Sequence, residues 1–311
     1  MSPDRIRSAP TGHARAGVGP ERPSGHARPG AGPERPSGRA WSAQQPGLLV
    51  LGPLVLRGAL GPVKLGGIKP RRLLAALALN VGSVISADRL IDLAWGELPP
   101  RTARQNLHTY LWSLRRSLAA AAGPRLVILQ RPPGYVLRAA PGELDWHRFR
   151  DLCSAARRCL SSDPVAGGTL LRQALGLWRG PALFDVADGL PQLAARLTAL
   201  EEERLSALEQ RIQADLAAGR HGELTAELAE LAAAYPFREQ FLAHQMVALY
   251  RSGRQAEALA GFHLLRERLA DELGVDPSPG LNRLYVAMLR ADPALDWPCA
   301  VPGALTRPSR S

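Results

Sequence analysis

The chain has 311 residues, 46% of them hydrophobic, which is long enough for two domains that each have a core. It contains no run of about 18 apolar residues and no apolar segment typical of an export signal, so we expect a soluble, cytoplasmic protein that does not enter a membrane. Its three cysteines and seven histidines lack metal-ligand spacing, so we expect no metal and no cofactor.

The net charge of +11 is distributed very unevenly along the chain. Residues 1–46 carry +4, residues 47–141 carry +10, and residues 142–311 carry −3. A strongly basic segment is the electrostatic footprint of a protein that binds a polyanion. Nucleotide composition could favour the 37 arginines over the 2 lysines, but it does not explain why the second half is acidic.

Both ends of the chain are predicted to be disordered. GHARAGVGPERPSG and GHARPGAGPERPSG, which begin at Gly12 and Gly25, form a near-perfect repeat with almost no apolar side chains. Such a sequence buries too little surface to offset its ordering entropy. We therefore expect disordered tails at 1–46 and 293–311, a DNA-binding domain at 47–141, and a helical domain at 142–292.

The basic segment begins with short apolar runs separated by Gly and Pro, which predict strands near 48–51, 54–57 and 62–65. A helix follows, with Pro70 in its first turn and a stop at Asn80. Ser86 is a predicted N-cap for a second helix that ends before Gly96. After a third helix, LVILQRPPGYVLR predicts a hairpin whose tip, 131–134, projects from the domain.

The third helix is predicted from ARQNLHTYLWSLRRSL at 103–118. At about 100° per residue its leucines form one apolar stripe, while polar and basic side chains point the opposite way. Three helices followed by a hairpin match the plan of a winged helix-turn-helix, in which the third helix enters the major groove. The fold class is thus mainly α: a winged helix followed by an all-α domain.

We predict that this helix, its flanks, the first helix and the hairpin tip bind DNA. Arg and Gln carry paired hydrogen-bonding groups suited to base edges and phosphates. The alternative is a polar face that meets only water, but no acid and no lysine falls on it. Trp112 could equally pack on the preceding helix or the wing, and His108 could be an ordinary exposed histidine. The predicted contacts are Lys69, Arg71, Arg101, Arg104, Gln105, His108, Thr109, Trp112, Arg115, Arg116 and Arg131.

The second half is predicted to be helical throughout. Asp145 and Asp163 are candidate helix caps, and Pro191 begins a run that reaches Gly219. AAGRHGELTAELAEL from Ala217 and RSGRQAEALAGFHLL from Arg251 align at an offset of 34 residues. This is the period of a tetratricopeptide helical hairpin.

Residues 47–292 resemble the Streptomyces antibiotic regulatory protein (SARP) family. The resemblance rests on KPRRLLAALAL, ISADRLIDLAWG, PRTARQNLHTYLWSLRRSL and RPPGYVL in the first half, and on LWRGPALFDV, EEERLSALEQR, LYRSGRQAEAL and ELGVDPSPGL in the second. In this family a response-regulator-type winged helix precedes a bacterial transcriptional activator domain. The chain resembles the small, two-domain form, which has no appended ATPase module.

The resemblance implies a transcriptional activator, usually of an antibiotic gene cluster, located in the cytoplasm at the nucleoid. It also implies three partners: tandem direct repeats in double-stranded promoter DNA, RNA polymerase holoenzyme, and a second copy of the protein on DNA. The family commonly has Ser-Arg where this chain has Trp112-Ser113.

No catalytic motif competes with this interpretation, since G-x-x-x-x-G-K-[ST], H-E-x-x-H and G-x-S-x-G do not occur. The protein is therefore not expected to be an enzyme. The alternative is a helical-repeat adaptor whose basic domain binds RNA or nucleic acid without specificity.

Overall fold

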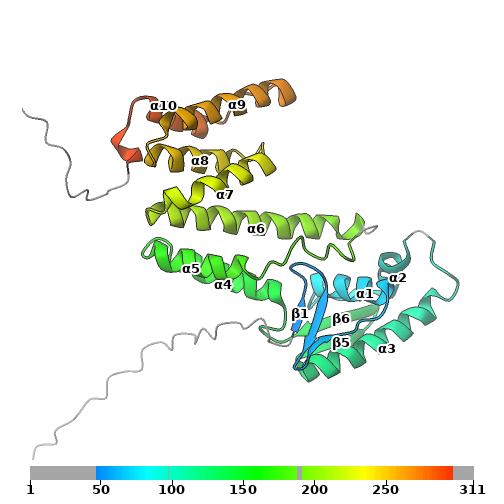
Figure 1. Cartoon of the computed structure of the whole chain (residues 1–311). Coiled ribbons are helices and arrows are strands. Elements are labelled where there is room, and N and C mark those ends of the chain that lie inside the picture. Colours follow the sequence, from blue (N-terminus) through cyan, green and yellow to red (C-terminus); the bar gives the residue numbers. More distant parts are fainter. Residues whose placement is uncertain (1–46, 97, 188–190, 297–311) are drawn as a thin grey trace, which may run out of the picture. The chain divides into compact units, whose positions relative to one another are not determined.

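The structure is a computed structural model that describes residues 47–96, 98–187 and 191–296. The predicted disordered tails lie outside these residues, except that the second tail was predicted to begin too early: Pro293–Leu295 form a short 3-10 helix, and Leu295 O accepts a bond from Arg251 at 2.8 Å. It contains two small sheets near its start and a series of helices after them (Figure 1). The strands are β1 (Gly47–Leu49), β2 (Val55–Gly58), β3 (Gly61–Val63), β4 (Ile85–Ser86), β5 (Leu126–Arg131) and β6 (Gly134–Ala139). The helices are α1 (Ile68–Leu79), α2 (Ala87–Trp95), α3 (Ala103–Ala122), α4 (Asp145–Cys159), α5 (Pro164–Leu175), α6 (Pro191–Ala217), α7 (His221–Ala234), α8 (Glu239–Arg251), α9 (Gln255–Leu273) and α10 (Pro279–Leu289).

The first half has the winged-helix order predicted from the sequence. Strands β1, β2 and β3 form one antiparallel sheet, and β4, β6 and β5 form a second. Helix α1 begins with Pro70 in its first turn and is followed by Asn80. The Ser86 side chain accepts a hydrogen bond from the amide of Arg89, so the predicted cap of α2 is confirmed. The fold class is confirmed, while the predicted strand ends shift by one or two residues.

The hairpin of β5 and β6 is confirmed; at its tip Arg131, Pro132 and Pro133 are exposed, but Gly134 is buried against the start of α2. Gly134 pairs with Ser86 of β4, and Pro133 O accepts from the Ala87 amide at 3.4 Å. A Cβ at position 134 would lie 1.8 Å from Ile85 O, so only glycine permits this approach. The tip is thus fastened to the start of α2.

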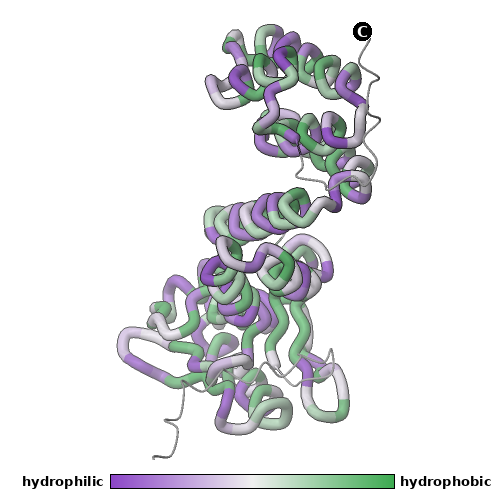
Figure 2. Tube along the Cα trace, turned by 90° about the vertical axis from the view of Figure 1, so that its left-hand side faces the viewer, coloured by the Kyte–Doolittle hydropathy of each residue, from purple (hydrophilic) through white to green (hydrophobic). Residues whose placement is uncertain are grey.

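Helices α4 to α10 follow one another as neighbouring antiparallel helices in the second half (Figure 1). Hydrophobic and hydrophilic residues alternate along them (Figure 2), as expected for helices that bury one side. Phe241 and Leu228 are buried in the cluster between α6, α7 and α8, while Met246 and Phe262 belong to the next cluster, between α8, α9 and α10.

The predicted 34-residue repeat is visible in the backbone. Gly219 follows α6 with a φ of +78°, and Gly253 follows α8 with a φ of +77°. The next residues, Arg220 and Arg254, donate their amides back to Asp215 O and Leu249 O, respectively. The two turns therefore have the same left-handed glycine and the same local hydrogen bond, as in a helical-hairpin repeat.

The prediction that Asp145 caps its own helix is wrong. The carboxylate lies in the first turn of α4, and its oxygens accept the amides of Val50 and Leu51 at 2.9 to 3.0 Å. These two amides follow β1 and have no strand beside them, so a buried acceptor satisfies them. Asp163, in contrast, accepts the Ala166 amide at 2.9 Å, so that predicted cap is confirmed.

Further contacts join the segment after β1 to the segment that follows α5. The Arg179 amide donates to Leu51 O at 2.8 Å, and the Leu183 amide donates to Gly52 O at 2.6 Å. The Leu54 amide donates to the Asp185 carboxylate at 2.9 Å. The first and second halves are therefore connected by backbone hydrogen bonds as well as by the chain.

Candidate nucleic-acid interface

Helix α3 presents two different faces. Leu107, Leu111, Leu114 and Leu118 are at most 1% exposed and pack into the first half. The face opposite this stripe bears polar and basic side chains, all of them exposed. We call this set, together with the flanking Arg101, the recognition face; its members are Arg101, Arg104, Gln105, His108, Thr109, Trp112 and Arg116.

Two members of the recognition face form an exposed stacked pair. Trp112 is 58% exposed, and its ring lies beside the guanidinium carbon of Arg116, 4.9 Å from the ring centroid. The Trp112 ring is therefore largely available at the surface of α3. A planar cation next to an exposed indole is a surface that can lie against bases or sugars.

Helix α3 is attached to the hairpin through Tyr135, a residue that was not among the predicted contacts. The Tyr135 hydroxyl lies 3.2 Å from His108 Nδ1, and the Arg115 guanidinium lies 5.7 Å from the tyrosine ring centroid. The Arg115 Nε also donates to Ile128 O at 2.9 Å. Arg115 is half-buried, and its bond to β5 fixes the hairpin against α3. Whether Arg115 also contacts DNA remains a prediction.

Helix α3 itself carries no acid, as predicted, but an acid from the neighbouring helix reaches this face. Asp88, from the first turn of α2, pairs with Arg104 at 2.5 Å. The two side chains are 77% and 66% exposed, respectively. Exposed ion pairs contribute only about 0–1 kcal/mol, so a phosphate could displace this carboxylate at little cost.

Three further basic residues of the first half are exposed. Arg131 lies at the end of β5, in the hairpin tip. Arg89 on α2 and Arg138 on β6 are exposed as well and make no ion pair with another described residue. Neither position belongs to the contacts predicted from the sequence, although their charge could have indicated them.

Lys69 and Arg71 have other surroundings than the recognition face. The Lys69 ammonium lies 5.8 Å from the centroid of the Trp95 ring. Arg71 forms an ion pair with Asp185 and donates to Leu54 O at 3.3 Å, so it contributes to the contact between the two halves. The structure does not bring Arg71 together with the predicted contacts on α3.

Within the described ranges there is no cluster of three or more His, Cys, Asp or Glu side chains that could hold a metal ion. No helix in these ranges is both long and apolar enough to cross a membrane.

Two family models match the chain. The model described as "Transcriptional regulatory protein, C terminal" matches residues 64–137, and the model described as "Bacterial transcriptional activator domain" matches residues 144–289. The first match contains α3 and most of the hairpin, and the second begins at the residue before α4.

Several relatives match both halves. The regulatory protein DnrI of Streptomyces peucetius is 40% identical over 254 residues, which cover 79% of this chain and 93% of the relative. The transcriptional regulator RedD of Streptomyces coelicolor is 38% identical over 272 residues, 84% of this chain and 77% of the relative. The regulatory protein AfsR of Streptomyces coelicolor is 44% identical over 249 residues, but the match spans only 24% of that longer protein.

A solved structure shares the fold. The structure of Mycobacterium tuberculosis EmbR in complex with a low-affinity phosphopeptide superimposes with a TM-score of 0.75 and 34% sequence identity. The match covers 79% of this chain and 65% of EmbR. With both family models and near full-length relatives matched, the chain belongs to the Streptomyces antibiotic regulatory protein family of DNA-binding transcriptional activators.

Proposed function

We propose that this protein is the pathway-specific activator of a secondary-metabolite gene cluster. It binds tandem direct repeats upstream of promoters and recruits RNA polymerase holoenzyme. The observation that carries the proposal is the recognition face, where arginines, Gln105 and Trp112 are exposed on one side of a helix whose other side is buried. DnrI and RedD, which are named as regulators, support the regulatory role.

The recognition face suits a helix that lies in the major groove. Gln105 and Arg116 are our candidates for base contacts because each can form two hydrogen bonds with one base edge. Arg101, just before α3, and Arg131, at the end of β5, are our candidates for phosphate contacts. Arg104 would exchange its Asp88 partner for a phosphate.

We assign DNA binding to residues 47–141 and activation to residues 142–292. The first segment carries net +10 and the residues from 142 onward carry net −3, which suits protein partners better than phosphate. The helical hairpins offer surfaces for the polymerase and for a neighbouring copy on the next repeat. Binding to promoter DNA would place the protein at the nucleoid.

The test uses the full chain and promoter DNA of the adjacent gene cluster. We expect a footprint over repeated sequence elements, retention of RNA polymerase at the promoter, and stimulated transcription in a purified system. Equal affinity for operator, random DNA and RNA of the same length would instead support the helical-repeat adaptor.

A fragment without the helical half should bind DNA without activating transcription, and the residue at which it stops decides whether the DNA-binding half keeps its hydrogen bonds. Leu48 donates its amide to Glu143 O at 2.8 Å, and the Val50 amide needs Asp145. A fragment that stops at residue 141 loses both acceptors, whereas one that ends at residue 160 keeps them. The fragment 47–160 is therefore the appropriate comparison, and activation by it equal to that of the full chain would refute the division of roles.

A further inference from the structure

The helical half contains a cavity of about 910 Å³ next to the segment that follows α5. Its walls come from α5, α6 and α7 and from residues 176–187, which we call the coupling segment. This volume is within the range of about 300–1,000 Å³ that is typical of small-molecule sites. The cavity lies apart from the recognition face, and the proposed function does not use it.

Part of the wall is apolar and aromatic. Trp178, Phe184 and Tyr235 line the cavity together with Leu175 and Leu197. Phe184 is 54% exposed although it is a large aromatic side chain. Aromatic walls favour a flat, aromatic occupant, because rings gain from stacked and edge-to-face contacts beyond the area that they bury.

The charged groups of the wall are balanced by partners. Arg204 pairs with Glu201 at 2.7 Å, and the Tyr235 hydroxyl donates to the same carboxylate at 3.1 Å. Arg211 pairs with Glu227, and Arg172 donates to Asp215 at 2.7 Å. Such walls offer no uncompensated charge for an ionic ligand, but they offer hydrogen bonds to hydroxyl or carbonyl groups.

The coupling segment contacts both the cavity and the DNA-binding half. Trp178, Phe184 and the three consecutive residues 180–182 line the cavity. Three other residues of the segment contact the segment after β1: Arg179 bonds to Leu51 O and Pro53 O, Leu183 to Gly52 O, and Asp185 to the Leu54 amide and to Arg71. A molecule that moves one side of this segment must strain the bonds on its other side.

We propose that this cavity binds an uncharged, planar aromatic molecule with hydroxyl or carbonyl groups at its edge, and that the coupling segment transmits its binding to the DNA-binding half. The molecule packs between Trp178, Phe184 and Tyr235, and the Glu201–Arg204 pair bonds its polar edge. Its binding changes the strength of the hydrogen bonds that hold residues 50–54.

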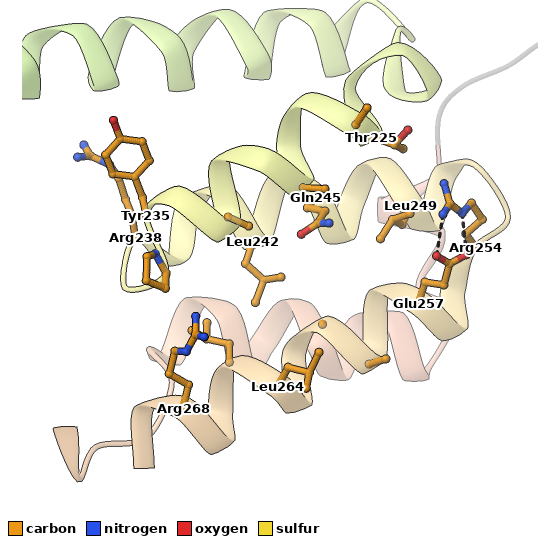
Figure 3. A pocket seen from close by; sticks show the side chains of 17 residues that line it. Thr225, Tyr235, Arg238, Leu242, Gln245, Leu249, Arg254, Glu257, Leu264 and Arg268 are labelled. Atoms are coloured by element: carbon orange, nitrogen blue, oxygen red, sulfur yellow. Dashed lines mark hydrogen bonds and ion pairs between the residues drawn. The ribbon is translucent and has the colours of Figure 1, made fainter. Parts of the chain in front are cut away.

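A second cavity provides an internal control. It has a volume of about 810 Å³ and lies between α7, α8 and α9, with Leu242, Gln245 and Leu249 on one wall (Figure 3). The Arg254–Glu257 pair lies at one end of it (Figure 3). Tyr235 lines both cavities, but none of the residues that line the second belongs to the coupling segment, so occupancy there should leave residues 50–54 unchanged.

The test titrates the full chain, without DNA, with Nile red, which is neutral, planar and carries a carbonyl. Thr198 lines the first cavity and Ala229 lines the second, and both are exposed helix positions. We expect saturable binding that Thr198→Trp weakens at least about tenfold and that Ala229→Trp changes less than about twofold. Phe184→Leu, which removes a ring but keeps an apolar side chain, should also weaken binding.

Hydrogen–deuterium exchange then measures the coupling. Saturating dye should alter exchange at residues 50–54 and 179–185 in the wild type and in Ala229→Trp, but not in Thr198→Trp. Absence of saturable binding, or binding that survives both Thr198→Trp and Phe184→Leu, overturns the site. Binding without a change at residues 50–54 overturns the coupling. Because no DNA is present, these outcomes are independent of whether the proposed regulatory function is correct.

Discussion

Replacement of Asp145 by alanine tests how the two halves are joined. The residue is 2% exposed, and its carboxylate is the acceptor for the amides of Val50 and Leu51. Each buried amide left without an acceptor costs about 1–3 kcal/mol, so the two together cost about 2–6 kcal/mol. The Arg179 guanidinium, 3.5 Å from the carboxylate, also loses its negatively charged partner and keeps its bond to Pro53 O.

The pH dependence of this loss distinguishes a buried carboxyl from an ordinary salt bridge. Burial raises the pKa of Asp145 from 3.8 to about 6, although the bonds from Val50 and Leu51 and the charge of Arg179 lower it. Between these two pKa values the native state keeps a proton that the unfolded state releases, so wild-type stability increases as the pH falls. The linkage relation gives a gain of about 1 kcal/mol between pH 7.5 and pH 5.

The assay is urea unfolding of the wild type, Asp145→Ala and Asp145→Asn at pH 7.5 and pH 5, followed by circular dichroism. Neither variant has this titrating group. The free energy of unfolding of each variant should therefore be lower than that of the wild type by about 1 kcal/mol more at pH 5 than at pH 7.5. Asp145→Asn keeps the size of the side chain and one acceptor oxygen, so it should fold even if the alanine variant does not. If the difference in unfolding free energy between wild type and variants is the same at both pH values, or smaller at pH 5, burial does not raise the pKa of Asp145.

The other predictions concern DNA binding, measured by gel shift and footprinting on operator and random DNA. Gln105→Ala or Arg116→Ala should cost about 1–3 kcal/mol on the operator and relax preference at one base position, and equal losses on both DNAs would indicate a backbone contact. Arg131→Ala should weaken binding to all sequences and lower the salt slope by about one, whereas an altered sequence preference would place it in the groove. Ser113→Arg should raise non-specific affinity, and an unchanged salt slope would mean that this exposed position points away from DNA. Deletion of residues 1–46 should leave the operator footprint intact, and its loss would make the tail part of the site.

The sequence predicted the elements whose signals are local. Ser86 and Asp163 were identifiable as caps because a cap needs only its own side chain and an amide three residues later in the chain. The leucine stripe of α3 and the paired glycines at 219 and 253 were predictable from periodicity alone. Element order and the amphipathic recognition helix therefore followed from short-range patterns.

What the sequence could not predict depends on partners far along the chain. Asp145 bonds to residues 94 and 95 positions earlier, and Arg71 pairs with Asp185 across 114 positions. Tyr135 reaches His108 across 27 positions. No local pattern separates a basic residue that faces DNA from one that bonds within the protein. Arg71, which joins the two halves, and Arg115, which bonds to β5, were therefore predicted together with the exposed residues of α3.

The contacts between the two halves bear on how activation depends on DNA binding. Domains joined by a linker move relative to each other unless a substantial interface holds them. Here the chain between β6 and α4 is itself bonded: the Ala140 amide donates to Arg125 O at 2.7 Å, and Glu143 O accepts the Leu48 amide. Because Asp145, Arg179 and Asp185 add buried or partly buried bonds to residues 50–54, this junction is a set of hydrogen bonds rather than a free linker. In the function that we propose, the helical half contacts the polymerase, and this junction would carry that surface to the promoter together with the recognition face. Such joint placement is what binding at fixed repeats needs in order to determine where polymerase is retained.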